Sequence, residues 1–119
     1  MAKLIKIPTF TDKRGSISIV EKFIGFKIKR VYYLYNFNNQ SRGEHKHKKN
    51  IQFVVCLKGK IKINTIYKRK VKAYNLINPR YGLLLMPKDW HEIIPKDNNS
   101  ILLVLASEFY NKNDYSYEI

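Results

Sequence analysis

Hydrophobic residues recur mostly at every second position along the chain, in short segments rich in β-branched and aromatic residues. Glycine, asparagine or proline interrupts these segments at intervals of about ten residues, which is the pattern of an all-β protein. Little helix is expected, because no long segment keeps a helical period and only residues 108–113 suit a short helical turn. The predicted strands are residues 4–7, 16–20, 28–37, 51–57, 60–67, 71–77, 83–86, 91–95 and 101–106.

Residues that favour turns separate several of these strands. Lys58-Gly59 predicts a tight hairpin, and the Lys-Arg-Lys segment at residues 68–70 predicts another. Residues 78–82 place a proline and a glycine as a turn requires.

Two segments, Phe53–Leu57 and Ile101–Leu105, are apolar at every position and predict central strands that are covered on both faces. Two packed sheets of this kind form a small β-sandwich or barrel whose interior can hold one ligand. A chain of 119 residues, of which 45% are hydrophobic, suits a single domain over residues 1–119.

The charge balance is strongly basic, since 23 Lys and Arg against 9 Asp and Glu give a net charge of +14. An anionic partner is therefore expected. The lysines of residues 60–64 alternate with isoleucines, which is typical of a solvated strand face. No nucleic-acid recognition motif accompanies the basic residues, so nucleic-acid binding is not expected.

The single cysteine, Cys56, cannot form an internal disulfide, and the first residues lack the apolar core of a signal peptide. The longest uncharged apolar run, residues 100–107, is far below the ~20 residues that a membrane-spanning helix needs. A cytoplasmic protein without a membrane span is predicted.

The three histidines are the strongest candidates for chemistry. His45 and His47 lie two residues apart, so a strand places both imidazoles on the same face. His91 follows Trp90 and is placed to reach the same cavity from a neighbouring strand. The alternative is a pair of surface histidines in a lysine-rich loop.

The His-x-His pattern resembles the first motif of cupin barrels, in which a carboxylate and a later histidine complete a metal site. Here Gln52 stands where that carboxylate is expected, and the second motif's Pro-x-Gly is Pro87-Lys88-Asp89. The spacing from Gln52 to Gly59 still fits a cupin barrel. We therefore expect a small cupin-like β-sandwich or jelly roll, without a metal ion.

The chain resembles the nucleotide-sugar 3,4-ketoisomerases almost end to end. Lys46 departs from the family pattern, in which a small residue often separates the histidines, but it points to the opposite face of the strand. The order and spacing of the matching segments are more specific than the His-x-His motif alone. These segments are Asp12–Ser16, Lys29–Tyr33, Arg42–Lys48, Gln52–Gly59, Trp90–Glu92 and Leu105–Ser107, with Tyr110 and Asp114-Tyr115.

This resemblance implies a homodimeric enzyme, with possible exchange of N-terminal strands, that needs neither metal nor cofactor. Its substrate would be a dTDP-linked 4-keto-6-deoxyhexose, dTDP-4-keto-6-deoxyglucose, which it converts into the 3-keto isomer. An aminotransferase would then act on the new ketone, towards a dTDP-3-amino-3,6-dideoxyhexose for lipopolysaccharide or another glycan. The ketone at C4 acidifies the hydrogen at C3, and histidine suits its removal near neutral pH. We predict His47 as the base, or His45 in its place, with proton return to C4 through an enediol.

Other side chains are candidates for substrate contact. Tyr33 and Tyr35 share one face of their strand and are predicted to donate hydrogen bonds to the enediolate, Tyr33 as a catalytic residue; core packing is the alternative. Arg14 and Arg42 offer the bidentate fork that suits a pyrophosphate, unless they pair with neighbouring carboxylates.

Trp90 either stacks on the base or caps the barrel, and His91 is either a second acid or a wall of the pocket. Two other functions stay open from the sequence. One is a nucleotide-sugar 3,5-epimerase, which also uses a histidine base in a β-barrel. The other is a non-catalytic cupin that only binds a sugar or an anion.

Overall fold

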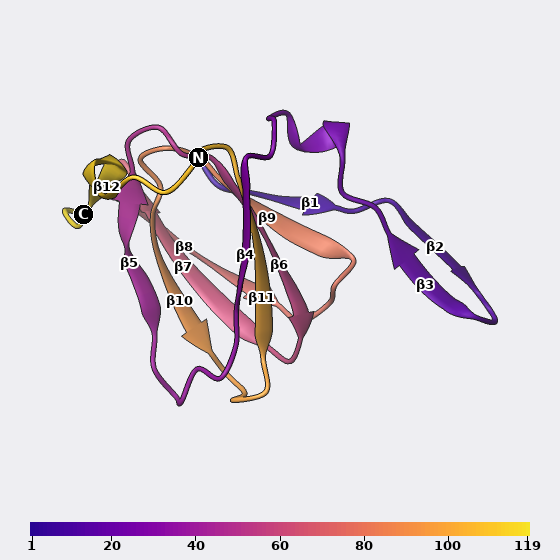
Figure 1. Cartoon of the computed structure of the whole chain (residues 1–119). Coiled ribbons are helices and arrows are strands. Elements are labelled where there is room, and N and C mark those ends of the chain that lie inside the picture. The colour runs from indigo at the N-terminus through magenta and orange to yellow at the C-terminus, as the bar shows by residue number, and fades with distance from the viewer.

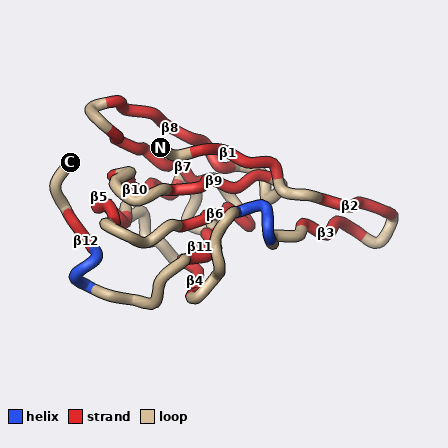
Figure 2. The backbone as a smooth tube through the Cα atoms, turned by 90° about the horizontal axis from the view of Figure 1, so that it is seen from above, coloured by secondary structure: helices blue, strands red, loops and turns tan.

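Two five-stranded antiparallel sheets face one another in the computed structural model, which describes residues 1–119 (Figure 1). The elements are β1 (Lys3–Lys6), β2 (Thr9–Asp12), β3 (Gly15–Ser18), η1 (Lys22–Ile24), β4 (Arg30–Leu34), β5 (Arg42–His47), β6 (Gln52–Lys58), β7 (Ile61–Tyr67), β8 (Lys70–Leu76), β9 (Tyr81–Leu85), β10 (Trp90–Pro95), β11 (Ile101–Ala106), η2 (Lys112–Asp114) and β12 (Tyr115–Ser116). One sheet has the order β1-β9-β6-β11-β4 and the other the order β12-β5-β10-β7-β8. The helices are limited to η1 and η2, which Figure 2 draws in blue, so the prediction of an all-β chain with little helix is confirmed.

The pairing of the strands is that of a jelly roll. β4 pairs with β11, β5 with β10, β6 with β9 and β7 with β8. The chain from β4 to β11 is thus one long hairpin that folds over to form both sheets. Its tip is the turn at Lys68 and Arg69, whose φ values of 48° and 67° close β7 onto β8 and confirm the hairpin predicted there.

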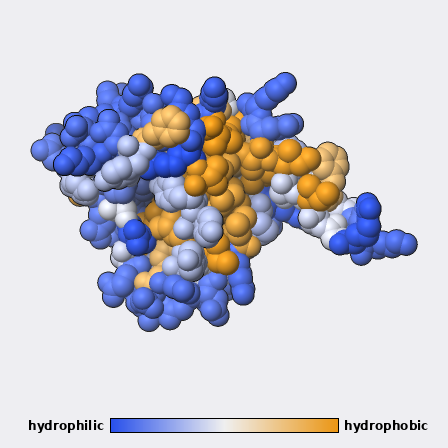
Figure 3. Space-filling model, in the orientation of Figure 1, coloured by the Kyte–Doolittle hydropathy of each residue, from blue (hydrophilic) through white to orange (hydrophobic).

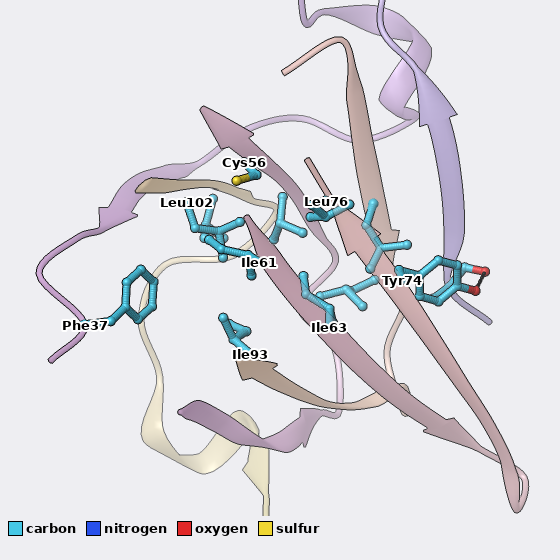
Figure 4. Packing of buried hydrophobic residues seen from close by; sticks show 13 residues of the cluster. Phe37, Cys56, Ile61, Ile63, Tyr74, Leu76, Ile93 and Leu102 are labelled. Atoms are coloured by element: carbon cyan, nitrogen blue, oxygen red, sulfur yellow. Dashed lines mark hydrogen bonds between the residues drawn. The ribbon is translucent and has the colours of Figure 1, made fainter. Parts of the chain in front are cut away.

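The interior between the sheets is filled by every second residue of the central strands. On β6, Val54 and Cys56 point into this layer, whereas Phe53 and Val55 pack on the outside of the sheet against residues 20–28. Both faces of β6 and β11 are therefore covered, which confirms their prediction as central strands. Figure 4 shows the two sheets meeting in the main cluster, which comprises Ala2, Phe37, Val54, Cys56, Ile61, Ile63, Tyr74, Leu76, Leu83, Leu85, Ile93, Leu102 and Val104.

The hairpin predicted at Lys58-Gly59 is wrong. β6 and β7 belong to different sheets, so these two residues carry the chain from one sheet to the other. Gly59 has a φ of 82°, and a Cβ built on it would lie only 2.8 Å from Ser100 Cα. A glycine permits a sharp change of chain direction both in a hairpin and in a crossing between sheets. Local sequence therefore does not tell whether the strand after Gly59 pairs with the strand before it or joins the other sheet.

Several boundaries differ from the prediction. The strand expected over residues 28–37 is shorter, as β4, and β2, β5 and β12 were not among the predicted strand ranges. The helical turn expected over residues 108–113 begins later, at Lys112. The turn before β9 is confirmed, since the amide of Tyr81 donates to the carbonyl of Asn78 at 3.2 Å. Neither three-residue helix has the length or hydrophobicity that a membrane crossing requires.

The β2–β3 hairpin projects from the body of the molecule (Figures 1 and 2). Its apolar side chains Phe10 and Ile17 are 65% and 64% exposed. Figure 3 shows hydrophobic surface over the middle of the body, continuing towards the base of this hairpin. A protein of this size rarely leaves such apolar area in water without a partner for it.

Candidate active site

The three histidines converge at one end of the barrel. β5 carries His45 and His47, and the antiparallel neighbour β10 places His91 directly opposite His45. One nitrogen of each ring lies within 4.8 Å of a nitrogen from each of the other two. The three imidazoles therefore lie together in the structure, as the sequence predicts.

Hydrogen bonds determine which nitrogen of each ring carries the proton. The Nδ1 atom of His45 lies 3.0 Å from the carbonyl of Gly43, and that of His91 lies 3.1 Å from the carbonyl of Asp89. His47 Nδ1 lies 2.9 Å from Asp114 Oδ2. Because carbonyl and carboxylate oxygens only accept, all three rings are assigned a proton on Nδ1 and a free electron pair on Nε2.

Burial keeps these rings neutral. It lowers the pKa of His91 to about 3, and the nearby His45 adds to that effect. Burial also lowers the pKa of His45 and of His47, while the hydrogen bond to Asp114 acts in the opposite direction on His47. Near pH 7 the cluster therefore offers uncharged bases rather than cations.

A cavity of about 310 Å³ opens beside the cluster. Its walls combine an apolar floor with two arginines, two tyrosines, two histidines and a glutamine. No carboxylate lines it, so its field favours an anion. The lining residues are Arg30, Tyr32, Leu34, Arg42, Gly43, His45, Gln52, Val54, Leu85, His91, Ile93, Val104 and Tyr115.

Several buried polar atoms at the site lack a partner. They are Arg30 Nε, His47 Nε2 and Gln52 Oε1. Buried polar groups are normally paired, because an unmade hydrogen bond costs about 1–3 kcal/mol. Because Arg30 and Gln52 line the cavity, their unpaired atoms favour a polar ligand there.

Tyr32 is one of the two tyrosines that line the cavity, with Tyr115. Its hydroxyl oxygen accepts a hydrogen bond from Gln52 Nε2 at 2.8 Å, which leaves the hydroxyl proton free to be donated. Burial raises the pKa of this phenol, so it stays protonated near neutral pH. Gln52 stands where a cupin would carry a metal-binding carboxylate, and here its side-chain amide donates a hydrogen bond to Tyr32.

Tyr33 and Tyr35 lie on the other face of β4. They are 62% and 59% exposed and stack on each other with 5.8 Å between ring centroids. The two-residue spacing does place them together, but the residues that reach the cavity are Arg30, Tyr32 and Leu34. In this chain the pair does not share a site with the histidines.

The two predicted arginines are far apart. Arg42 lines the cavity, as does His91. Arg14 stands at the tip of the projecting hairpin, where its Nη2 pairs with Asp12 at 2.6 Å. Trp90 begins β10 next to His91 but does not line the cavity.

His47 lies one layer deeper than the cavity wall. It is 3% exposed, and the ring of Tyr115 covers it at 4.5 Å between centroids. Tyr115 and Asp114 come from the C-terminal segment, where β12 pairs with the end of β5. Sequence reasoning gave these two residues no role, and Asp114 lies 67 residues from His47, so no local signal indicates the contact.

Three imidazoles with free Nε2 atoms are potential metal ligands, each held through Nδ1 as metal-binding histidines commonly are. The remaining polar lining fits a cation poorly. Two arginines line the cavity and no carboxylate does, so the positive charge of the wall opposes a cation. The donor set suits an anionic or polar organic ligand better.

Comparisons with known proteins agree with this geometry. A protein-family model described as FdtA, WxcM-like, C-terminal matches residues 1–119. The chain belongs to this family. A TDP-4-oxo-6-deoxy-alpha-D-glucose-3,4-oxoisomerase of Aneurinibacillus thermoaerophilus is 36% identical over 116 residues, which are 95% of this chain and 84% of that protein.

Solved structures extend the likeness to the fold. The 3,4-ketoisomerase QdtA of Thermoanaerobacterium thermosaccharolyticum, as a histidine-to-asparagine variant in complex with TDP-4-keto-6-deoxyglucose, matches with a TM-score of 0.93 and 38% identity over 98% of this chain and 87% of that one. The rmlC epimerase of Mycobacterium tuberculosis matches with a TM-score of 0.82 and 17% identity over 96% of this chain and 66% of that one. The epimerase shares the cupin-like fold alone, whereas the family relationship lies with the ketoisomerases.

Proposed function

We propose that this protein is a sugar 3,4-ketoisomerase that converts dTDP-4-keto-6-deoxyglucose into the 3-keto isomer. The observation that carries the proposal is the cluster of three neutral imidazoles, two of them buried and that of His45 half-buried, beside a cavity lined by arginines and a protonated phenol. A neutral imidazole removes a proton next to a ketone, and the cationic walls suit a sugar linked to a diphosphate. The family relationship supports the same reaction.

The proposed reaction begins at C3 of the sugar. His47 Nε2 removes the C3 proton, the electron pair of that C–H bond forms the C3–C4 double bond, and the C4 oxygen takes up the negative charge. Proton transfer at the two oxygens gives the enediol. A proton then returns to C4, the C3 hydroxyl loses its proton, and a ketone forms at C3 with no net change in composition.

Three groups support this sequence of steps. Tyr32 donates its free hydroxyl proton towards the enediolate oxygen, and Arg30, which lies 5.0 Å over the Tyr32 ring, adds positive charge there. His45 lines the cavity and is the candidate to take up the proton of the C3 hydroxyl on its free Nε2 and to deliver it to C4. For His47 to act as the base, substrate binding must bring C3 to its Nε2 next to Tyr115; catalytic contacts commonly tighten only in the complex.

We also propose that the active form is a homodimer in which the β2–β3 hairpin reaches the partner subunit. The hairpin exposes Phe10 and Ile17, and the outer face of β4 and β6 exposes Tyr33, Tyr35 and Leu57. Apolar surface of this extent is stabilised by burial between subunits. Tyr33 and Tyr35 then serve the subunit contact rather than the enediolate.

In such a dimer Arg14 would reach the pyrophosphate in the partner's cavity, while Arg42 binds it within its own chain. Arg14 cannot serve its own chain's cavity from the tip of the hairpin, where it is exposed and paired only with Asp12.

We also propose a cytoplasmic location, where nucleotide sugars would be the substrates. The single cysteine, Cys56, is a buried free thiol, as suits a reducing compartment. The product would supply an aminotransferase in glycan biosynthesis.

Heterodimers of two inactive variants test the contribution of Arg14 from the partner subunit. R14A removes a charge-assisted contact worth about 1.5–3 kcal/mol, so kcat/KM should fall about 10- to 100-fold. Differently tagged R14A and H47N chains, purified as the mixed dimer, should regain about half of the wild-type activity, because one of the two sites is complete. K13A alters the same turn and should leave kcat/KM unchanged. A mixed dimer no more active than its parents would show that Arg14 does not act across the interface.

Proton NMR of the protein with dTDP-4-keto-6-deoxyglucose in D2O containing EDTA tests the reaction itself. Disappearance of the C3 and C4 signals of the substrate and formation of a 3-keto sugar despite the chelator are expected. Deuterium exchange at C3 and C5 without ketone migration would identify an epimerase instead. Unchanged sugar signals, with binding of the nucleotide still detected, would identify a protein that only binds.

A further inference from the structure

Asp114 stands behind His47, on the side away from its free Nε2 atom. We propose that Asp114 is the positioning residue of the reaction, whose carboxylate holds the proton of His47 on Nδ1 and so keeps Nε2 as the base. The role of Asp114 in the reaction rests on the proposed function, whereas its hydrogen bond to His47 Nδ1 is a property of the folded chain.

The carboxylate of Asp114 is held from several sides. Its Oδ1 accepts from the amide of Lys49 at 2.7 Å, and its Oδ2 accepts from the amide of Asn50 at 3.3 Å as well as from His47. The backbone carbonyl of Asp114 accepts from the amide of Lys48 at 2.9 Å. The three amides that follow His47 therefore all donate to this one residue, which places its oxygens with little freedom to move.

This arrangement distinguishes His47 from the other two histidines. His45 and His91 donate to neutral backbone carbonyls, and only His47 donates to a carboxylate. A ring that takes a proton becomes a cation, and an adjacent carboxylate stabilises that cation more than a carbonyl does. The contact thus favours His47 over His45 as the residue that removes the C3 proton, a choice that the sequence left open.

Other charged and titratable groups also act on His47. Its neighbours come from β5, β10, β12 and β4, and they are His45, His91, Tyr115 and Arg30. His45 and Arg30 lower its pKa, so Asp114 is the group that opposes both burial and these neighbours. Removing the carboxylate should therefore lower the pKa of His47 further and move the acidic limb of the pH-rate profile to lower pH.

A D114N substitution reverses the hydrogen bond with little change in size. The amide oxygen of asparagine should stay with the backbone amide of Lys49, because the hydrogen bond from Lys49 is short, at 2.7 Å, whereas that from the amide of Asn50 is long, at 3.3 Å. The NH2 group then points at His47 Nδ1, which must become the acceptor, so the ring proton moves to Nε2. A ring protonated there cannot remove a proton from the sugar. We expect kcat to fall at least about 10²-fold with KM changed less than about threefold.

Nitrogen-15 NMR of histidine-labelled protein reads the tautomer of His47 without any turnover. The wild type should show Nδ1–H and D114N should show Nε2–H. The pH-rate profile of D114A should keep a measurable acidic limb, and this limb should lie at lower pH than in the wild type. A wild-type His47 protonated on Nε2, or a D114N variant with unchanged kcat, would overturn the proposal even if one of the variants folded poorly.

N111A provides the matched control. Asn111 caps η2 by accepting from the amide of Asn113 at 3.0 Å, so its loss loosens the same turn without touching the carboxylate. Its kcat and its His47 tautomer should match those of the wild type. If the wild type showed the Nδ1–H tautomer but did not isomerise the sugar, the proposed function would fail while the assignment of Asp114 to the His47 proton stood.

Discussion

An H47N variant is expected to lose about 10²- to 10⁴-fold in kcat, the range for removal of a general base. Asparagine keeps a polar group at the buried position but has no electron pair that can take a proton near pH 7. Because His47 is 3% exposed and does not line the cavity, binding of the nucleotide should be nearly unchanged. Single-turnover rates, with dTDP affinity measured by calorimetry, separate the two effects.

The matched comparison is H45N. His45 lines the cavity and bonds to the carbonyl of Gly43, so its loss should affect both binding and the return of the proton to C4. In D2O, H45N should still exchange the C3 hydrogen of the substrate, whereas H47N should not. Exchange at C3 that survives in H47N and disappears in H45N would assign the base to His45.

A G59A variant is expected to be destabilised by about 3 kcal/mol or more, through backbone strain and overpacking together. The φ of 82° at this residue is unfavourable for any side chain, and the added Cβ would lie 2.8 Å from Ser100 Cα and 3.0 Å from Ser100 Cβ. Ser100 cannot move aside easily, since its hydroxyl bonds to both the amide and the carbonyl of Lys60. Urea unfolding measures the loss of stability.

Gly25 offers a control with the same backbone but open surroundings. Its φ is 79°, and a Cβ built there has nothing within 4 Å. G25A should therefore cost only the strain of the left-handed conformation, about 1–2 kcal/mol. The difference between the losses of stability in the two variants measures the cost of the contact between the new Cβ at residue 59 and Ser100. Equal losses of stability would show that strain alone limits both positions.

The alternation of apolar residues was sufficient to predict most strands and the central position of β6 and β11. That information is local, because a strand buried on both faces must be apolar at every position. The same two-residue rule predicted that His45 and His47 share a face, and the resemblance to the ketoisomerases predicted the family. Arg42 and His91 were also predicted for the site, and both line the cavity.

Only the tertiary structure decided which face of β4 meets the histidines. Alternation separates Tyr33 and Tyr35 from Tyr32, but both sets contain aromatic residues, so the pattern does not say which set is inside. The cavity places Arg30 and Tyr32 beside its apolar floor, while Tyr33 and Tyr35 stand on the outer surface. A ligand site inside a barrel reverses the usual rule that apolar residues face inwards.

The contacts that complete the site are also long-range. Asp114 meets His47 across 67 residues of chain, and Arg14 is carried away from its own cavity by a projecting hairpin. Local sequence determined the strands, the turns and the residue types available for catalysis, because those depend on neighbours a few positions apart. The crossing at Gly59, the inner face of β4 and the partner of His47 depend on how distant strands pack, and only the folded chain decides them.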